Sequence, residues 1–241
     1  GHDVLDASDT DIPADVAEKI LRFARCALAV GQIKNKAYVN IGGIAMGIAG
    51  SFCDADFMQK YLGLRAEWVD LTEVLRRITL EIYDNDEYEK ALFWIKANCK
   101  EGFDKNKGKD LPEIIKRSKV VPADKDWEFI AKFTIIVRDI LFGNPKLKEM
   151  GWSEESLGRN GIVGGFQGQR MWTDWLPNGD FTEAIMASSF DWNGKKAPFA
   201  FATENDTLNG ISMLFATLLT GKAPCFHDVR TYWSPDSVKR V

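Results

Sequence analysis

One short apolar run that ends in paired glycines sets the fold class: Lys36-Ala37-Tyr38-Val39-Asn40-Ile41-Gly42-Gly43. Its β-branched and aromatic side chains predict a strand, and the glycines predict a tight turn directly after it. A helical stretch follows near 44–62, and a second strand is predicted at 66–70. This order of strand, glycine-rich turn and helix favours an α/β layer fold.

The rest of the chain alternates in the same way. Amphipathic helices are predicted at 71–83, 87–99 and 124–143, and a surface loop at 100–109. An earlier helix is predicted from Pro13 to a stop at Gly31, with an apolar face that carries Val16, Ile20, Phe23, Ala24, Ala27 and Leu28. The pattern therefore predicts an α/β fold, with a mostly parallel sheet flanked by helices in a Rossmann-like layer.

Composition narrows the class of protein. The 241 residues are 45% hydrophobic and 27% charged, with a net charge of −4, as in ordinary globular proteins. No basic face predicts nucleic-acid binding, no apolar run is long enough to span a membrane, and the first residues do not form a secretory signal. Four widely spaced cysteines without a CxxC predict reduced, mostly buried thiols in a cytoplasmic protein.

Two acids are the candidate catalytic and metal-binding residues. Apolar runs at 197–203 and 223–227 are each interpreted as a buried strand, and they end in Glu204 and Asp228. Open α/β sheets bind ligands at the carboxyl ends of their strands, and carboxylates favour Mg²⁺, Ca²⁺ or Mn²⁺. Asp206 is a nearby competing acid, and the stretch 205–209 could instead cap the helix that follows.

His227 directly precedes Asp228 and is one of only two histidines. Adjacent side chains on a strand point to opposite faces, so we do not expect His227 and Asp228 to share a metal. A packed or partly exposed histidine is the preferred interpretation.

Glycine-rich segments follow two of the predicted strands. The segment 42–51 lacks the spacing and the lysine of a nucleotide phosphate loop, so a backbone turn near a ligand is the better interpretation. The segment 161–174 places glycines beside Gln167, Gln169, Arg170 and Trp172. Amides, a guanidinium and an indole suit a polyol pocket, although a structural turn under a tryptophan remains an alternative.

Several segments together resemble bacterial L-fucose isomerases. They are Ile44-Ala45-Met46-Gly47-Ile48-Ala49-Gly50-Ser51, Gly165-Phe166-Gln167-Gly168-Gln169-Arg170 with Trp172-Thr173-Asp174, Ser189-Phe190-Asp191-Trp192-Asn193-Gly194, Ala202-Thr203-Glu204-Asn205-Asp206 through Asn209-Gly210, and Asp228-Val229-Arg230-Thr231-Tyr232-Trp233-Ser234-Pro235. They occur in the family's order over nearly the whole chain. Ser234-Pro235-Asp236 is typical of a helix opening, so we expect this chain to be an internal fragment.

The resemblance implies three parts. Residues 1–33 correspond to a linker and lead-in helix, 34–219 to the second α/β domain, and 220–241 to the truncated start of a C-terminal domain. Subunits in that family form homo-hexamers, and a preceding domain helps to close a neighbouring subunit's site.

The resemblance also implies a reaction and its residues. The family interconverts L-fucose and L-fuculose, and D-arabinose and D-ribulose, with Mn²⁺ held by Glu, Asp and His. Glu204 and Asp228 match the two carboxylates, Gln169 matches a substrate-binding amide, and Met46 is expected in the pocket wall. The histidine ligand belongs to a region that these residues do not include, so the fragment alone is expected to be inactive.

Three alternatives remain open from the sequence. The chain could be a non-catalytic sugar-binding or assembly domain, for which the missing histidine predicts weak or absent metal binding. It could be part of a related isomerase for another sugar, such as L-arabinose. A nucleotide-binding enzyme is disfavoured because the phosphate-loop lysine is absent.

Overall fold

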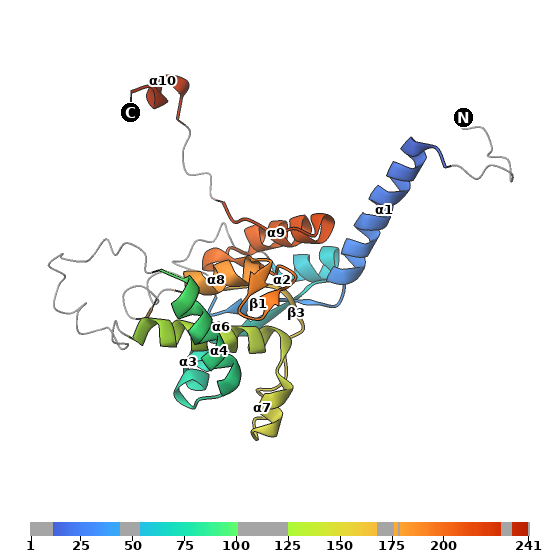
Figure 1. Ribbon diagram of the computed structural model, residues 1–241. Helices are drawn as coiled ribbons and strands as arrows, with labels where there is room; N and C mark the ends of the chain where they lie inside the picture. The colour runs from blue at the N-terminus through green and yellow to red at the C-terminus, as the bar shows by residue number, and fades with distance from the viewer. Residues whose placement is uncertain are drawn as a thin grey trace.

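A four-stranded parallel sheet lies at the centre of the protein (Figure 1). The computed structural model describes residues 12–43, 54–100, 125–167, 176–177, 179–227 and 233–240. The strand order is β2-β1-β3-β6. The strands are β1 (Ala37–Ile41), β2 (Arg65–Val69), β3 (Gly161–Phe166) and β6 (Ala200–Ala202). The predicted α/β class with a mostly parallel sheet is therefore confirmed.

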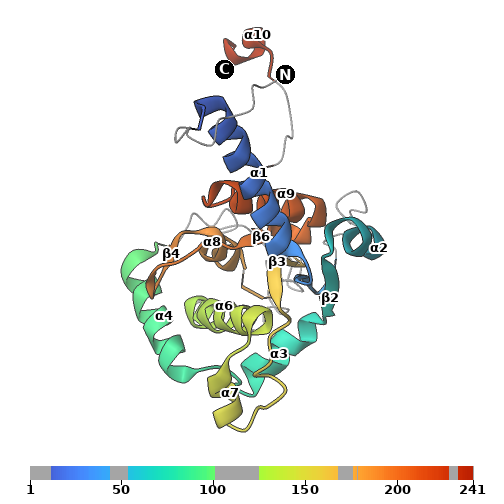
Figure 2. The same cartoon turned by 90° about the vertical axis from the view of Figure 1, so that its right-hand side faces the viewer.

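One face of the sheet is covered by the larger hydrophobic core. The helices on this side are α3 (Leu71–Thr79), α4 (Asn85–Asn98), α6 (Asp126–Phe142) and α8 (Asp180–Ala187). Phe133 of α6 meets Phe166 of β3 edge-to-face, with 5.2 Å between ring centroids. Figure 2 shows α6 directly below the strands.

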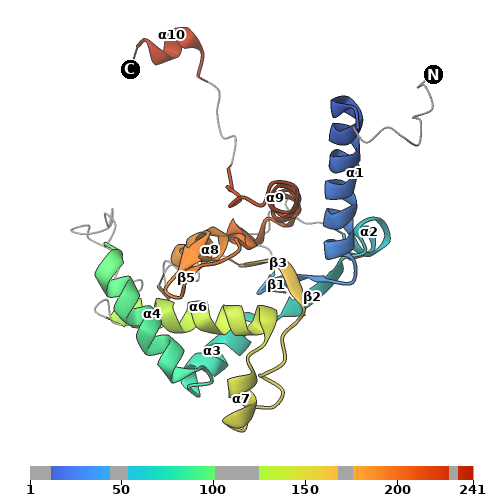
Figure 3. The same cartoon turned by 45° about the vertical axis from the view of Figure 1, so that its right-hand side comes forward.

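The opposite face carries a smaller core. It is covered by α9 (Thr207–Thr220), the short α2 (Ala55–Phe57) with the π-helical turn η3 (Met58–Leu62), and the base of α1 (Ala14–Ile33). Tyr38 and Val163 point to this side and pack with Met213 and Leu214 of α9. Figure 3 shows α9 and α6 on opposite sides of the sheet.

Short elements complete the described part of the chain. They are α7 (Pro145–Glu149), the hairpin of β4 (Phe190–Asp191) and β5 (Gly194–Lys195), the 3₁₀ turn η6 (Thr203–Asn205) and α10 (Pro235–Val238). The Ser234 side chain accepts a hydrogen bond from the Ser237 N–H at 3.2 Å, which confirms the predicted helix opening.

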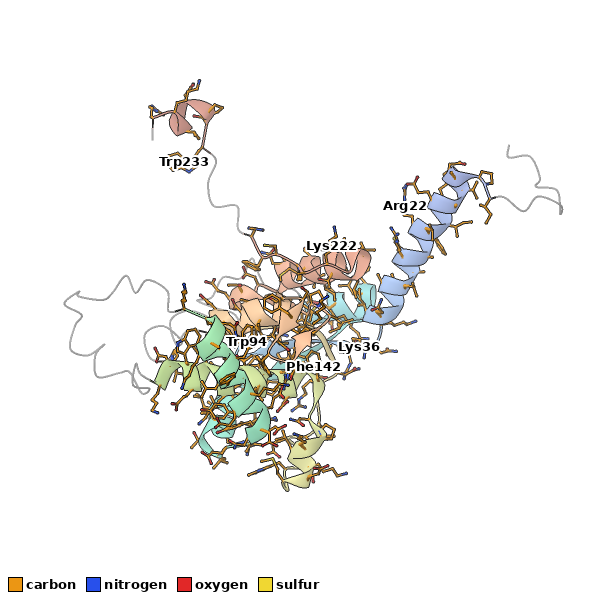
Figure 4. All side chains as sticks on the ribbon, viewed as in Figure 1. Arg22, Lys36, Trp94, Phe142, Lys222 and Trp233 are labelled. Atoms are coloured by element: carbon orange, nitrogen blue, oxygen red, sulfur yellow. The ribbon has the colours of Figure 1, made fainter. Side chains whose placement is uncertain are left out.

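The predictions for α1 were partly wrong. The helix forms, but it continues past Gly31 to Ile33, and the left-handed turn that follows uses Asn35 at φ 64°. Its apolar side chains are largely exposed: Phe23 is 76% and Leu28 is 67% accessible. Figure 4 shows why, since Arg22 and its helix lie away from the sheet and only the last turns reach the core.

A second correction concerns the run at 223–227. It forms no strand, and His227 and Cys225 are exposed, so the predicted buried strand before Asp228 is wrong. Apolar composition predicted a strand here, but no β-ladder partner pairs with this segment among the described residues.

The prediction of mostly buried thiols is also wrong at the described cysteines. Like Cys225, Cys26 is exposed, and Cys99 is partly buried.

Within the described residues, no helix combines the length and the apolar character that crossing a membrane requires.

Candidate functional site

The topology marks one edge of the sheet as the expected place for a ligand site. The chain leaves β1 toward β2 on one side, and β3 lies on the other side of β1 and leads on to β6. Open α/β sheets bind ligands outside the carboxyl ends of the strands at such a change of direction. The segments that leave β1, β3 and β6 at this edge begin with Gly42, Gln167 and Thr203.

Gly42 and Gln167 meet at this point. The Gln167 N–H donates to the Ile41 carbonyl oxygen at 2.7 Å, and the Gly42 N–H donates to the Val69 carbonyl oxygen at 2.8 Å. Gly42 has φ +85°, and a Cβ there would lie 3.0 Å from Gln167 Cβ and 3.2 Å from Leu71 Cβ. A glycine is needed here because both the backbone conformation and the space exclude a side chain.

Glu204 lies on the turn after β6, as the sequence predicted. Its backbone is left-handed, with φ 55° and ψ 15°, and the next residue, Asn205, has φ 58°. Two consecutive non-glycine residues in the left-handed region of backbone conformation are uncommon. Backbone strain of this kind is characteristic of functional positions. Glu204 is half-buried.

A second acid, Glu183 of α8, holds this turn and was not predicted. It is only 8% exposed, and its carboxylate accepts hydrogen bonds from the Thr203 hydroxyl at 2.7 Å and from the Glu204 N–H at 3.4 Å. Burial, with a smaller contribution from the charges of Asp180 and Glu204, raises the pKa of Glu183 to about 7. The sequence signal that could have identified Glu183 is the presence of a glutamate between Phe181 and Ile185 in a largely apolar helix.

Asn205 holds the turn from the other face of the sheet. Its side-chain amide is 1% exposed and donates to the Asn40 side-chain oxygen at 3.1 Å and to the Gly43 carbonyl oxygen at 2.7 Å. Its own side-chain oxygen accepts from the Tyr38 hydroxyl at 3.2 Å. The sequence did not distinguish Asn205 from an ordinary helix-capping residue.

The structure tests only part of the predicted site. Glu204 lies at the expected edge of the sheet, but Asp228, Gln169 and Met46 lie outside the described residues. Asp206 directly precedes α9, and its carbonyl oxygen accepts a hydrogen bond from the Gly210 N–H at 2.9 Å.

Of the two predicted metal-binding carboxylates, the described residues include that of Glu204. They contain no group of three or more His, Cys, Asp or Glu side chains that could hold an ion. The Glu204 carboxylate is a hard oxygen donor of the kind that Mn²⁺ or Mg²⁺ prefers, so it fits one ligand position. A complete set would need donors from outside the described residues.

Comparison with known proteins matches the whole chain. The family model described as L-fucose isomerase, second N-terminal domain, matches residues 36–221, and that of the first N-terminal domain matches residues 1–35. L-fucose isomerase from Clostridium perfringens is 70% identical over 241 residues, and those from Bacteroides fragilis and Vibrio vulnificus are each 56% identical over 241 residues.

These alignments cover 100% of this chain but 40% of each relative. A single family model accounts for the sheet, the helices from α2 to α9 and the Glu204 turn, because all of them lie within residues 36–221. The chain therefore belongs to the L-fucose isomerase family, and most of it corresponds to the second N-terminal domain.

Proposed function

We propose that this chain is part of an aldose–ketose isomerase that interconverts L-fucose and L-fuculose and also accepts D-arabinose, giving D-ribulose. The observation that carries the proposal is the 70% identity to an L-fucose isomerase along all 241 residues. The left-handed turn that presents Glu204 at the ligand-binding edge of the sheet supports it.

The reaction moves a proton between C2 and C1 of the open-chain sugar. Glu204 and Asp228 are the proposed acid and base that exchange this proton and the two proposed metal-binding carboxylates from this chain. Mn²⁺, when bound, would stabilise the negative charge that develops on the sugar's O1 and O2. Gln169 is proposed to bind sugar hydroxyls, and Met46 to line the pocket.

The remaining parts of the site come from outside this chain in the proposal. The chain spans 40% of the length of the relatives it matches. A histidine ligand and a covering domain would complete the centre within a homo-hexamer in the cytoplasm. The 241 residues alone are therefore proposed to be inactive.

A chimera tests this function directly. The 241 residues replace the matching 40% of the Clostridium perfringens enzyme, and ketose formation from L-fucose is measured with and without Mn²⁺. Mn²⁺-dependent turnover by the chimera, with none from the 241-residue chain, is the expected result. A folded chimera without activity on L-fucose or D-arabinose would overturn the proposal, and turnover by the chain alone would overturn its incompleteness.

A further inference from the structure

We propose that Glu183 is a positioning residue which, opposite Asn205, holds the Glu204 turn in its left-handed conformation before metal or sugar binds. This inference rests on the proposed function, because it concerns how the carboxylate of Glu204 is aimed. Neither residue needs to touch the substrate for this role.

Among the described residues, both hydrogen bonds of the Glu183 side chain go to the turn. One carboxylate oxygen accepts from the Thr203 hydroxyl at 2.7 Å, and the other accepts from the Glu204 N–H at 3.4 Å. Glu183 comes from α8, which packs against both β6 and α6. Burying a carboxylate is unfavourable unless its oxygens are hydrogen-bonded. The donors of the turn therefore stabilise the Glu183 carboxylate at this buried position.

Asn205 holds the same turn from the face of the sheet opposite to Glu183. Its amide connects the turn to Tyr38 and Asn40 of β1 and to the carbonyl oxygen of Gly43. The turn is therefore held from the α8 side and from the α9 side of the sheet at the same time. The same network holds the Gly43 carbonyl, where the chain leaves β1, and so connects the ends of β1 and β6, which lie on either side of β3.

The packing leaves the turn little freedom to relax. A Cβ on Gly165 would lie 2.8 Å from the Asn205 side-chain oxygen and 2.9 Å from Asn205 Cα, so η6 lies directly against β3. The left-handed backbone at Glu204 and Asn205 is unfavourable for residues with a Cβ and persists where surrounding contacts demand it. Preorganisation of a reacting group by such contacts is a general requirement of catalytic sites.

Two pairs of substitutions separate positioning from general stability. Glu183→Ala removes both acceptors, whereas Glu183→Gln keeps an acceptor for the Glu204 N–H and a polar group beside Thr203. Thr203→Val removes the hydroxyl donor at similar volume, whereas Thr203→Ser keeps it. Glu154→Ala, at an exposed position, is the control.

The first measurement is amide hydrogen exchange at Glu204 in the 241-residue chain by NMR. Faster exchange, by about tenfold or more, is expected in Glu183→Ala and Thr203→Val, since each removes a contact that closes the turn. Glu183→Gln, Thr203→Ser and Glu154→Ala are expected to exchange like the unsubstituted chain.

The second measurement is steady-state kinetics of the same variants in the chimera at saturating Mn²⁺. Misplacement of a reacting group by about 1 Å lowers kcat by roughly 100-fold, so this loss is expected for Glu183→Ala and Thr203→Val, with little change in KM for L-fucose. Recovery of most of kcat in Glu183→Gln and Thr203→Ser is expected.

The two proposals fail in different ways. Unchanged exchange and unchanged kcat in both Glu183→Ala and Thr203→Val would overturn the positioning role while leaving the isomerase intact. An inactive unsubstituted chimera would overturn the proposed function, and the exchange measurement would still decide whether Glu183 holds the turn. If Glu183→Ala does not fold, Thr203→Val and Thr203→Ser supply the same comparison.

Discussion

Asp139 lies near the end of α6, where it is 3% exposed and accepts a hydrogen bond from the Asn144 side chain at 3.2 Å. Burial raises the pKa of Asp139 to about 6, and the charge of Asp84 acts in the same direction. The Asn144 hydrogen bond and the charges of Arg138 and Arg77 oppose the rise. Protonation of this acid is therefore more favourable in the folded state than in the unfolded chain.

Because the pKa is higher in the folded state, the stabilisation from this proton is complete below about pH 3.8 and is lost as the pH rises through about 6. On the order of 3 kcal/mol of unfolding free energy is at stake between pH 4 and 7. Asp139→Asn should remove this step, so that the variant gains stability relative to the native chain at pH 7 but not at pH 4. Urea unfolding at several pH values measures it, with the exposed Asp15→Asn as control. An unchanged pH slope in Asp139→Asn would show that the pKa of Asp139 does not differ between the folded and unfolded states.

Glu204 and Asp228 carry the proposed chemistry. Glu204→Gln and Asp228→Asn each keep the shape of the side chain but remove the charge and the basic oxygen. In the chimera, each is expected to fold like the parent and to lose most turnover, on the order of 100-fold or more. Near-parental kcat in either variant would remove that residue from the catalytic role.

At the scale of elements, close backbone approach decides where side chains fit. At Gly165 of β3, an added Cβ would lie 2.8 Å from the Ala202 carbonyl oxygen. At Gly31 of α1, nothing lies within 4 Å of an added Cβ. The same substitution should therefore have opposite effects in the two elements.

Gly165→Ala is expected to destabilise the protein by roughly 1–3 kcal/mol, because η6 must move away from β3. Gly31→Ala is expected to stabilise α1 by about 0.5–1 kcal/mol, since alanine favours a helix more than glycine does. Thermal unfolding followed by circular dichroism measures both. A tolerated Gly165→Ala would mean that the turn shifts freely, which would also weaken the proposed positioning.

For the whole molecule, the notable surface is that of α1, whose apolar side chains are largely exposed. We define the α1 apolar surface as Ile20, Leu21, Phe23, Leu28 and Val30, each between 54% and 76% exposed. Extensive exposed apolar surface is uncommon on monomeric proteins and promotes association.

The isolated chain is therefore expected to self-associate as its concentration rises. Phe23→Ser with Leu28→Gln should reduce the association without loss of fold, because neither side chain belongs to the core. Light scattering after size-exclusion chromatography measures the mass at several concentrations. Phe93→Ser, at an exposed position on α4, is the control, and equal association in both variants would exclude the α1 apolar surface as the cause.

Helices and strands were predicted correctly from the sequence where the hydrophobic pattern of a segment matches its burial in the fold. The periodicity of 124–143 predicted α6, and the run 36–41 predicted β1, because both elements are buried along their length. The prediction was wrong at 223–227, where apolar composition suggested a strand but no ladder partner is present among the described residues. Periodicity also correctly predicted that α1 is a helix, yet not that its apolar side would be exposed.

The sequence by itself determined the α/β class, the family and the position of Glu204 at the end of a strand. These follow from short-range patterns that each segment carries on its own. Only the tertiary structure decided that Glu183 and Asn205, from opposite faces of the sheet, meet at that turn. Their hydrogen bonds join residues that are 21 and 165 positions apart, and no local periodicity encodes a contact between separate elements.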